Sequence, residues 1–455
     1  MVEIVEVLSQ RFHLDDAWSL DGYERAGGYV ATKKALEMGP DEIVQVVQDS
    51  GLRGRGGAGF PTGLKWSFMP KEPTRPSYIV CNADESEPGT YKDRWLLERD
   101  PHQLIEGVMI AGLAMRSEHG FIYIRGEYEF PARRLGNAIV EAYEQGCLGE
   151  DVFGTGRRFH LTLHRGAGAY ECGEETALMD SLEGRRGQPR LRPPFPAQSG
   201  VYGCPTTVNN VETLCNVPHI IEHGAEWYRQ WGTQKSPGPK LMCPSGELVD
   251  PKVLEVPLGT TVREIIDLCG GTVDGRPVKF YVPGGSSVPM LTGEHLDVGM
   301  DFESMQAAGS LLGTAALMVF TDRTCVVDAA LNWTKFYEAE SCGKCTPCRE
   351  GTYWLAQILT RIETGRGRMA DIDHVEDICS QIFGRSFCAF GDGAAQPPLT
   401  AIRHFRDEWE EHVRQGGCPF GPPAPQSDAE PGVLQPAVAG AAGTIEPPGV
   451  HPGAH

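Results

Sequence analysis

The sequence predicts a multidomain α/β protein that ends in a small helical domain. Three observations lead to this prediction. A length of 455 residues allows two to four domains. Glycine-rich loops and strand-like segments occupy the N-terminal half, whereas short β-branched runs and turn signals dominate residues 239–320. Four helical patterns then surround a group of closely spaced cysteines, which favours a helical bundle.

The first glycine-rich segment, residues 51–66, contains a formal GxGxxG pattern at Gly54, Gly56 and Gly59. That pattern alone is weak, because a dinucleotide fingerprint should follow a strand and open a helix. Residues 41–48 look helical instead, and Pro61 interrupts the segment after the glycines. Two interpretations stay open. The loop either cradles a phosphate, with Arg55 and Lys65 as charge partners, or is an ordinary glycine-rich turn.

Three later segments favour a ligand site. Residues 78–82 predict a buried strand that runs into the acidic loop 83–90, the position where α/β sheets bind ligands. Residues 165–178 place glycines and then Glu174 and Glu175 at a helix start, where the helix dipole alone is a sufficient reason for acids. The adjacent amides in residues 205–213 can pair with the edge of a heterocycle. Candidate aromatic residues for stacking on a planar base, each otherwise a core residue, are Phe60, Phe68 and Phe195.

The middle of the chain reads as a compact α+β module. Residues 252–256 and 278–282 are β-branched runs, and residues 261–268 predict one helix. The longest uncharged apolar run, 307–320, is too short to cross a bilayer. We expect that run to form a buried strand or helix.

Cys342, Cys345 and Cys348 are spaced so that three thiolates can surround one metal centre, and Cys388 could complete a [4Fe-4S] ligand set. A zinc site would need a second CxxC or a His pair, which the sequence around these cysteines lacks. A redox dithiol would sit at a helix start, whereas a predicted helix over 326–339 precedes the cysteines. An iron-sulfur cluster is therefore favoured over both alternatives, and the chain is expected to move electrons.

The other cysteines have no comparable spacing. Cys379 shares one apolar helical face with Val375 and Ile382, which predicts a core residue, and Cys418 is a weaker rival for the fourth ligand position. Further helices are predicted over 349–363 and 399–413. Fourteen cysteines without a recognisable signal peptide indicate a reducing compartment, for which the cytoplasm is the expectation.

The net charge of −20 argues against nucleic-acid binding, which needs clusters of Lys and Arg. Residues 421–455 contain eight prolines and no Lys or Arg, so we expect a disordered tail.

Five segments together resemble the NADH-binding flavoprotein subunit, the F-type subunit, of bacterial respiratory complex I (NADH:quinone oxidoreductase). They are residues 54–66, 82–89, 169–177, 208–213 and 341–351, and the resemblance extends over about 15–420. It implies a Rossmann-like FMN- and NADH-binding domain over 1–235, a ubiquitin-like β-grasp (SLBB-type) domain over 239–322, a helical [4Fe-4S] domain over 323–420 and a tail over 421–455.

The resemblance also implies site residues. The family's FMN contacts correspond here to Gly54, Arg55, Gly56, Lys65, Asn82, Asp84, Glu85, Ser86, Tyr170, Gly173, Glu174, Val208, Asn209, Asn210 and Thr213. Its NADH contacts correspond to Phe60, Phe68, Glu87, Glu175, Arg192 and Phe195, with Glu87 positioning the nicotinamide, and its cluster ligands to Cys342, Cys345, Cys348 and Cys388. Two positions depart from the common pattern: Arg192 replaces a lysine, and Glu171 replaces an apolar residue.

In such a family no catalytic acid or base is needed, because the flavin carries out the hydride chemistry. The resemblance implies a thioredoxin-like [2Fe-2S] subunit and a large multi-cluster iron-sulfur subunit as partners, with indirect membrane association at the cytoplasmic side of the cell membrane. The alternative is the diaphorase subunit of an NAD-linked hydrogenase or formate dehydrogenase. A non-enzymatic iron-sulfur scaffold is the alternative of a different class.

Overall fold

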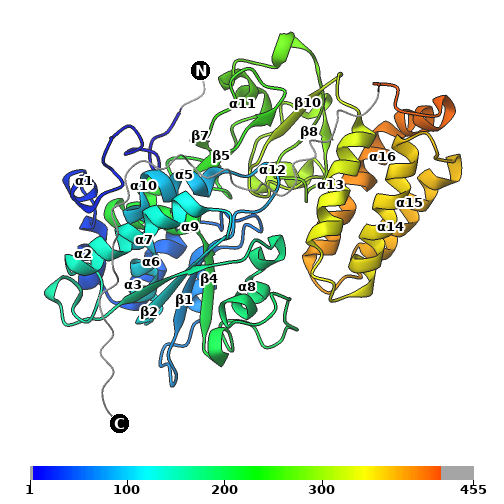
Figure 1. Cartoon of the computed structure of the whole chain (residues 1–455). Coiled ribbons are helices and arrows are strands. Elements are labelled where there is room, and N and C mark those ends of the chain that lie inside the picture. Colours follow the sequence, from blue (N-terminus) through cyan, green and yellow to red (C-terminus); the bar gives the residue numbers. More distant parts are fainter. Residues whose placement is uncertain (1–3, 422–455) are drawn as a thin grey trace, which may run out of the picture.

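The computed structural model describes residues 4–421, which form three packed parts (Figure 1). The N-terminal part is an α/β layer structure. A smaller mixed α/β part lies near the N-terminus in space, and a helical bundle stands beside both. These parts agree with the predicted fold class.

The N-terminal part is built on a four-stranded parallel sheet in the order β3-β2-β1-β4. The strands are β1 (Tyr78–Ala83), β2 (His119–Ile124), β3 (His160–Arg165) and β4 (Thr206–Asn210). The predicted strand over 78–82 is present as β1. Along β1, Ile79 and Cys81 face one apolar core while Val80 faces another, because side chains alternate between the two faces of a strand. Both faces of the sheet are therefore buried, as parallel sheets require.

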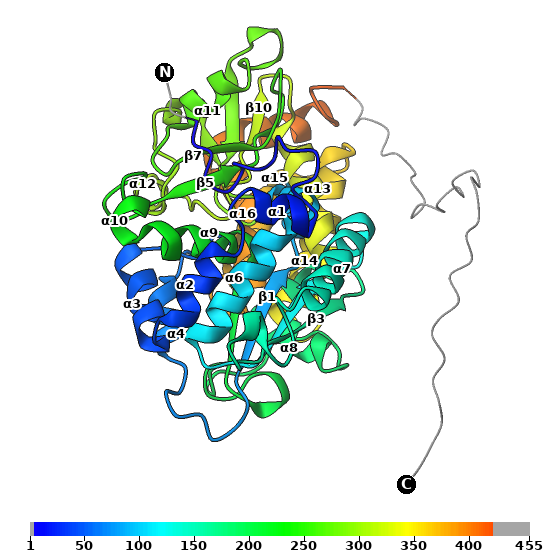
Figure 2. The same ribbon diagram turned by 90° about the vertical axis from the view of Figure 1, so that its left-hand side faces the viewer.

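Helices cover the two faces unequally. The larger core lies between the sheet and most of the helices, which face the viewer in Figure 2. The helices of this part are α1 (Leu20–Arg25), α2 (Val30–Glu37), α3 (Pro40–Ser50), α4 (Thr62–Ser67), α5 (Lys92–Arg99), α6 (Pro101–Ala114), α7 (Glu129–Glu144), α8 (Glu175–Leu182), α9 (Val211–His223) and α10 (Ala225–Tyr228), with short 3-10 turns η1 (Val152–Gly154), η2 (Tyr170–Gly173) and η3 (Val201–Gly203). Helix α8 covers the opposite face through Leu178 and Met179.

The order of the strands creates a switch point. From β1 the chain moves outward to β2 and β3, and then returns to place β4 on the other side of β1. In open α/β sheets the crevice at such a point, outside the carboxyl ends of the strands, is where ligands bind. The carboxyl ends of β1 and β4 carry Asn82 and Asn210.

The middle part contains a mixed sheet in the order β6-β10-β8-β9 and a two-stranded sheet of β5 and β7. Its elements are β5 (Pro239–Met242), β6 (Ser245–Gly246), β7 (Leu254–Pro257), α11 (Val262–Leu268), η4 (Val273–Gly275), β8 (Val278–Val282), β9 (Leu291–Thr292), η5 (Gly293–His295), α12 (Phe302–Ala307) and β10 (Met318–Thr321). The strand predicted over 278–282 and the helix over 261–268 are both present.

The apolar run 307–320 differs from the expectation. Its first residue, Ala307, ends α12 and its last residues form a strand, β10, while residues 308–317 are an irregular connection. Gly309 and Gly313 adopt positive φ angles of 85° and 53°, which favour glycine and turn the chain. The end of the run is a buried strand, as expected, but most of the run is neither strand nor helix.

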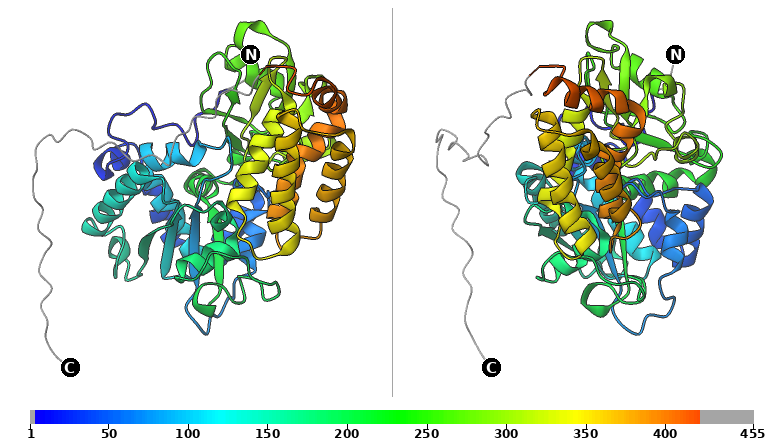
Figure 3. Two further views of the ribbon diagram at one scale, coloured as in Figure 1. Left: turned by 45° about the vertical axis from the view of Figure 1, so that its right-hand side comes forward. Right: turned by 90° about the vertical axis from the view of Figure 1, so that its right-hand side faces the viewer.

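The C-terminal part is a bundle of α13 (Val326–Glu340), α14 (Thr346–Glu363), α15 (Met369–Ile382) and α16 (Ala389–Gln415), which lie side by side in Figure 3. All four predicted helices are present. Helix α16 is longer than the predicted 399–413, and it kinks at Phe405, whose φ is −138°. Cys379 is fully buried in the apolar core of the bundle, as its helical spacing predicts.

The start of the described chain is fastened to the middle part. The carboxylate of Glu255 on β7 accepts backbone N–H groups from Val7, Leu8 and Ser9 at 2.8–3.2 Å. No helix among residues 4–421 has the length and apolar character needed to cross a bilayer. The predicted tail over 421–455 lies outside the described residues, apart from Gly421.

Candidate functional site

Two adjoining cavities open at the carboxyl ends of β1 and β4. The outer cavity has a volume of about 910 Å³ and the inner one about 560 Å³. They share a wall made of Gly56, Gly57, Ala58, Asn82, Gly173 and Asn210. The site predicted at the end of the strand over 78–82 is therefore a continuous cleft at the switch point of the sheet.

The glycine-rich loop lies against the N-terminus of α9. A Cβ atom on Gly56 would lie 2.8 Å from Cβ of Asn210, so only glycine allows this approach. Asn210 caps α9 by accepting the N–H of Glu212 at 3.1 Å. Because open backbone amides and the positive end of a helix attract anions, this corner can hold a phosphate group.

Only one of the two predicted charge partners reaches the cleft. Lys65 lines the outer cavity, whereas the guanidinium of Arg55 is fully buried and donates to Tyr228 Oη at 2.9 Å and to the carbonyl of Pro237 at 3.0 Å. The backbone N–H of Arg55 donates to Thr213 Oγ1 at 2.8 Å. Arg55 thus supports the loop from behind, and the expectation that its charge faces a phosphate is wrong. Spacing could not reveal this, because the direction of the side chain depends on the packing of α10.

Three exposed aromatic rings surround the outer cavity. Phe60, Phe68 and Phe195 are 45%, 56% and 53% exposed, and the rings of Phe60 and Phe68 lie 6.2 Å apart. Large apolar side chains at a cavity mouth that are half exposed indicate a surface for a planar ligand. The alternative that these residues belong to the core does not hold.

Glu175 carries the negative charge of the outer cavity. Its carboxylate accepts from Lys65 Nζ at 2.9 Å and lies 3.3 Å from Arg192 Nη1. Burial alone would raise the pKa of Glu175, but the charge of Lys65 outweighs it and holds the pKa below its usual range. Glu175 is thus ionised at neutral pH at the cavity wall.

The neighbouring Glu174 is the N-cap of α8. Its Oε2 accepts the N–H groups of Thr176 at 2.8 Å and Ala177 at 2.9 Å, and its other oxygen pairs with Arg192. The interpretation of both acids as ordinary helix-start residues therefore describes Glu174 well. Both acids also border the cleft, because Glu174 lines the inner cavity and Glu175 lines the outer one.

A buried acidic wall borders the inner cavity. Burial raises the pKa of Asp84 and of Glu85 to about 7 and also raises that of Glu87. Glu87 accepts from Tyr170 Oη at 2.6 Å and from the N–H of Ser287 at 2.8 Å. Tyr170 and Glu87 thus fix each other at the cavity.

The remaining predicted residues of the two cavities are held in place by side-chain hydrogen bonds or line the cavity walls. Asn82 Nδ2 donates to the carbonyl of Gly173 at 2.8 Å, and Ser86 Oγ donates to Asp84. Asn209 accepts from Trp66 Nε1 at 2.8 Å. The carboxylate of Glu85 is used differently, because it accepts the first N–H groups of α5, from Asp93 and Arg94. Val208 and Thr213 line the outer cavity.

The four predicted cluster ligands line one small cavity at the side of the bundle. Cys342, Cys345 and Cys348 come from the start of α14 and the residues before it, and Cys388 is the N-cap of α16. Burial raises the pKa of Cys348 to about 12 and raises that of Cys388 further, so a cation is needed to hold them as thiolates. Four cysteine sulfurs around one cavity are the donor set of a [4Fe-4S] cluster. Cys418, the rival ligand, lies elsewhere.

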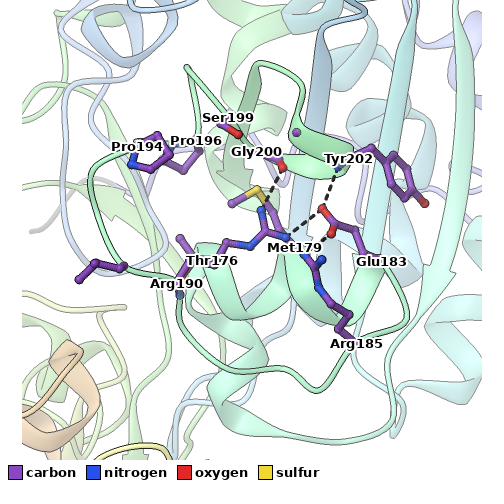
Figure 4. A pocket seen from close by; sticks show the side chains of 12 residues that line it. Thr176, Met179, Glu183, Arg185, Arg190, Pro194, Pro196, Ser199, Gly200 and Tyr202 are labelled. Carbon is purple, nitrogen blue, oxygen red and sulfur yellow. Dashed lines mark hydrogen bonds and ion pairs between the residues drawn. The ribbon is translucent and has the colours of Figure 1, made fainter.

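A further cavity of about 770 Å³ lies on the other side of α8 (Figure 4). It contains a clamp on the loop that carries Arg192 and Phe195. Arg190 pairs with Asp180 and Glu183 at 2.8 Å and donates to the carbonyl of Gly200 at 2.9 Å. This clamp fixes both ends of the loop against α8.

Comparison with known proteins agrees with this geometry. Residues 47–219 match the Nuo51 FMN-binding domain, residues 245–291 the SLBB domain, and residues 328–412 the NADH-ubiquinone oxidoreductase-F iron-sulfur binding region. The F subunit of the NADH-quinone oxidoreductase of Streptomyces coelicolor is 57% identical over 92% of this chain and 93% of its own length. The chain belongs to the family of NADH-quinone oxidoreductase F subunits.

Two other F subunits extend the comparison. That of Mycobacterium tuberculosis is 56% identical over 92% of this chain and 96% of its own length, and that of Escherichia coli is 51% identical over 87% of this chain and 90% of its own. A chain of an NAD+-reducing [NiFe]-hydrogenase in its H2-reduced state has a TM-score of 0.76 and 38% identity. The alignment covers 83% of this F subunit and 63% of that hydrogenase chain.

Sequence reasoning missed several residues of the F-subunit site. Lys92 lines the inner cavity, and Gly284 and Ser287 reach it from the middle part of the molecule. Glu171 lines the cysteine cavity, where Cys388 Sγ donates to its Oε1 at 3.2 Å. Lys92 follows the acidic loop closely and could have been found there. Glu171 was visible only as a departure from the family pattern.

Proposed function

We propose that this chain is the NADH-oxidising flavoprotein subunit of a proton-translocating NADH:quinone oxidoreductase. The observation that carries the proposal is the continuous cleft at the switch point, whose inner cavity is walled by all three parts of the chain and includes Phe390 of the cysteine cavity. Bound FMN would supply the chemistry that accepts a hydride from NADH and releases electrons singly to a [4Fe-4S] cluster. The protein supplies proximity and orientation.

We propose that the inner cavity and the shared wall hold FMN. The glycine loop at Gly54 and Gly56 and the N-terminus of α9 would receive the phosphate, and Asn82, Asp84, Ser86 and Asn210 would contact the rest. Lys65, which lines the outer cavity, would supply a positive charge to the phosphate by exchanging its hydrogen bond to the carbonyl of Val208 at 2.9 Å.

The outer cavity would hold NADH. Its three aromatic rings can stack on the adenine, and Glu175 can accept hydrogen bonds from ribose hydroxyls. Glu87, at the inner cavity, would position the nicotinamide. Cys342, Cys345, Cys348 and Cys388 would ligate the cluster.

Members of this family are subunits of a multisubunit enzyme. We propose as direct partners a thioredoxin-like [2Fe-2S] subunit and a large multi-cluster iron-sulfur subunit. The whole complex would sit at the cytoplasmic side of the cell membrane, and this chain would reach the membrane only through its partners. Its net charge of −20 argues against nucleic acid as a partner.

Likeness to the hydrogenase chain supports a second candidate, the diaphorase subunit of an NAD-linked hydrogenase. Affinity purification of the tagged full chain from its host distinguishes the two candidate functions. Co-purification of membrane quinone-reducing subunits supports the first proposal, and co-purification of a hydrogenase supports the second. A colourless preparation that neither releases FMN nor reduces ferricyanide with NADH would contradict both and favour a scaffold.

A further inference from the structure

A second group of metal-binding side chains meets at the end of the bundle away from the cluster cysteines. Cys325 precedes α13, Glu363 ends α14, His412 lies in the last turn of α16, and Cys418 follows that helix. One ligand atom from each lies within 4.8 Å of all the others. Helix α13 spans about 22 Å at 1.5 Å per residue, so it separates this group from Cys342.

The distances between the ligand atoms suit tetrahedral coordination of one ion. His412 Nε2 lies 3.2 Å from Cys325 Sγ and 3.2 Å from Glu363 Oε2, and Cys325 Sγ lies 3.8 Å from Glu363 Oε2. Bonds of about 2.0 Å to nitrogen or oxygen and about 2.3 Å to sulfur place tetrahedral ligand atoms roughly 3.3 to 3.8 Å apart. The observed distances therefore need only small adjustments around an ion.

The surroundings orient two of the four groups, His412 and Cys325, as metal ligands are oriented. Nδ1 of His412 donates to the carbonyl of Glu408 at 2.7 Å, so the lone pair of Nε2 faces the group. The N–H of Asp328 donates to Cys325 Sγ at 3.3 Å.

Glu363 supplies an independent sign of a missing ligand. It is 3% exposed, and its Oε1 is buried without a hydrogen-bond partner. Among residues 4–421, only His412 lies within ion-pair distance of this carboxylate. A buried carboxylate oxygen without a donor is costly unless a cation compensates it.

We propose that Cys325, Glu363, His412 and Cys418 bind a structural Zn²⁺ ion. Two sulfurs, one imidazole nitrogen and one carboxylate oxygen are zinc ligands, whereas Mg²⁺ and Ca²⁺ prefer oxygen and iron-sulfur clusters prefer four thiolates. Four protein ligands leave no position open for substrate, so the ion is structural. Binding forms two Zn–S bonds and releases both thiol protons to solvent, without any redox change. The ion would fasten the ends of α14 and α16 to the start of α13.

The test is the metal content of the full chain, purified with its flavin and cluster and dialysed against a weak chelator. Elemental analysis by mass spectrometry should find about one zinc per chain in addition to the iron. Cys418→Ser and His412→Gln should each lower zinc at least tenfold while iron and FMN stay unchanged. Cys379→Ser is the matched control, because Cys379 is a buried bundle cysteine outside the group and its loss should leave zinc in place.

A second measurement keeps the proposal testable if the variants fold poorly. Zinc-edge X-ray absorption of the wild-type protein should show two sulfur and two nitrogen or oxygen neighbours. Absence of zinc from wild-type protein with full iron content would overturn the proposal, as would zinc that persists in Cys325→Ser/Cys418→Ser. A disulfide between Cys325 and Cys418, found by peptide mapping, would also overturn it.

Discussion

Glu175 sets the charge of the outer cavity wall and with it the choice of nucleotide. An ionised carboxylate accepts hydrogen bonds from ribose hydroxyls and repels a 2′-phosphate. We predict that Glu175→Gln raises the ratio of kcat/KM for NADPH to that for NADH about tenfold, which corresponds to about 1.4 kcal/mol. Ferricyanide reduction with each nucleotide gives the ratio. Asp377→Asn, an exposed carboxylate on α15, is the control, and an unchanged ratio in Glu175→Gln would return Glu175 to a structural role.

Phe195 presents an exposed ring to the same cavity, so its removal should affect the ligand and not the fold. Stacking on the adenine contributes about 1 kcal/mol beyond area burial. We predict that Phe195→Ala raises KM for NADH about fivefold with unchanged FMN content and melting temperature. Tyr353→Ala removes a comparably exposed ring from α14 and should change none of these quantities. Loss of flavin in Phe195→Ala would place Phe195 in the FMN site instead.

Glu171 introduces a carboxylate beside the ligand Cys388, and burial raises its pKa to about 7. A negative charge near a cluster disfavours its reduction by Coulomb repulsion, on the order of 2 kcal/mol at an effective dielectric constant of about 20. For one electron this is on the order of 90 mV at full ionisation, and half of it when the group is half ionised. Glu171→Gln should therefore raise the midpoint potential, measured by redox titration of the electron paramagnetic signal. A potential that stays the same or falls would show that the carboxyl is neutral in the loaded protein.

Some residues of the site could be predicted from the sequence, and others could not. A ligand site at the end of β1 could be predicted because polar residues follow a recognisable buried strand. Lys65 and Phe195 were candidates by residue type, whereas the role of Glu175 came only from the family resemblance; all three line the outer cavity. Arg55 could not be placed, because the burial of its guanidinium depends on Tyr228 and Pro237, which lie far along the chain. The group around Glu363 and His412 could not be predicted, because its four members do not form a recognisable spacing motif in the sequence.

Among the secondary-structure elements, α8 and the loop from Arg185 to Gly203 act together. Arg190 is largely buried between Asp180 and Glu183 and holds the carbonyl of Gly200, so it positions the loop that carries Phe195 (Figure 4). We predict that Arg190→Met raises KM for NADH about fivefold with little change in kcat. In this variant the loop would become ordered only when NADH binds, at a cost of about 1 kcal/mol.

Arg185→Met is the matched control for Arg190→Met. Arg185 pairs with the same two acids but is 59% exposed, so its removal should leave KM nearly unchanged. Equal effects of the two substitutions would mean that only the charge near the loop matters and would contradict the clamp.

The elements themselves were the most predictable level of the structure. The four bundle helices have apolar residues at helical spacing, and strands β1 and β8 are short apolar runs rich in β-branched and aromatic residues. The connection 308–317 was not predictable, because apolar composition alone does not distinguish a buried strand from a buried irregular segment. The glycines in this segment, which adopt positive φ angles in the structure, were the one feature of the sequence that indicated an irregular connection.

In the molecule as a whole, the position of Cys388 connects the cysteine cavity with the cleft. Phe390, two residues later, lines both. We predict that Cys388→Ala abolishes the [4Fe-4S] electron paramagnetic signal, because three thiolates alone hold such a cluster poorly. FMN content and NADH-ferricyanide activity should remain measurable.

Cys379→Ala is the control for Cys388→Ala. Its side chain fills the core of the bundle without facing the cysteine cavity, so the signal should persist while stability falls by about 1 to 3 kcal/mol. A normal cluster signal in purified Cys388→Ala would contradict the proposed ligand set.

The order in which the cleft-forming segments occur along the chain determines when the cleft can form during synthesis. Strand β1 borders the cleft, yet its neighbour β4 is synthesised only after β2 and β3, on the order of 10 s later at ordinary elongation rates. The inner cavity also needs Gly284 and Phe390. A nascent chain on the ribosome thus exposes a half-finished parallel sheet, the kind of edge that aggregates and that chaperones cover. Flavin and iron can therefore be inserted at the earliest near the end of translation, so overproduction that outruns cofactor supply should yield insoluble apoprotein.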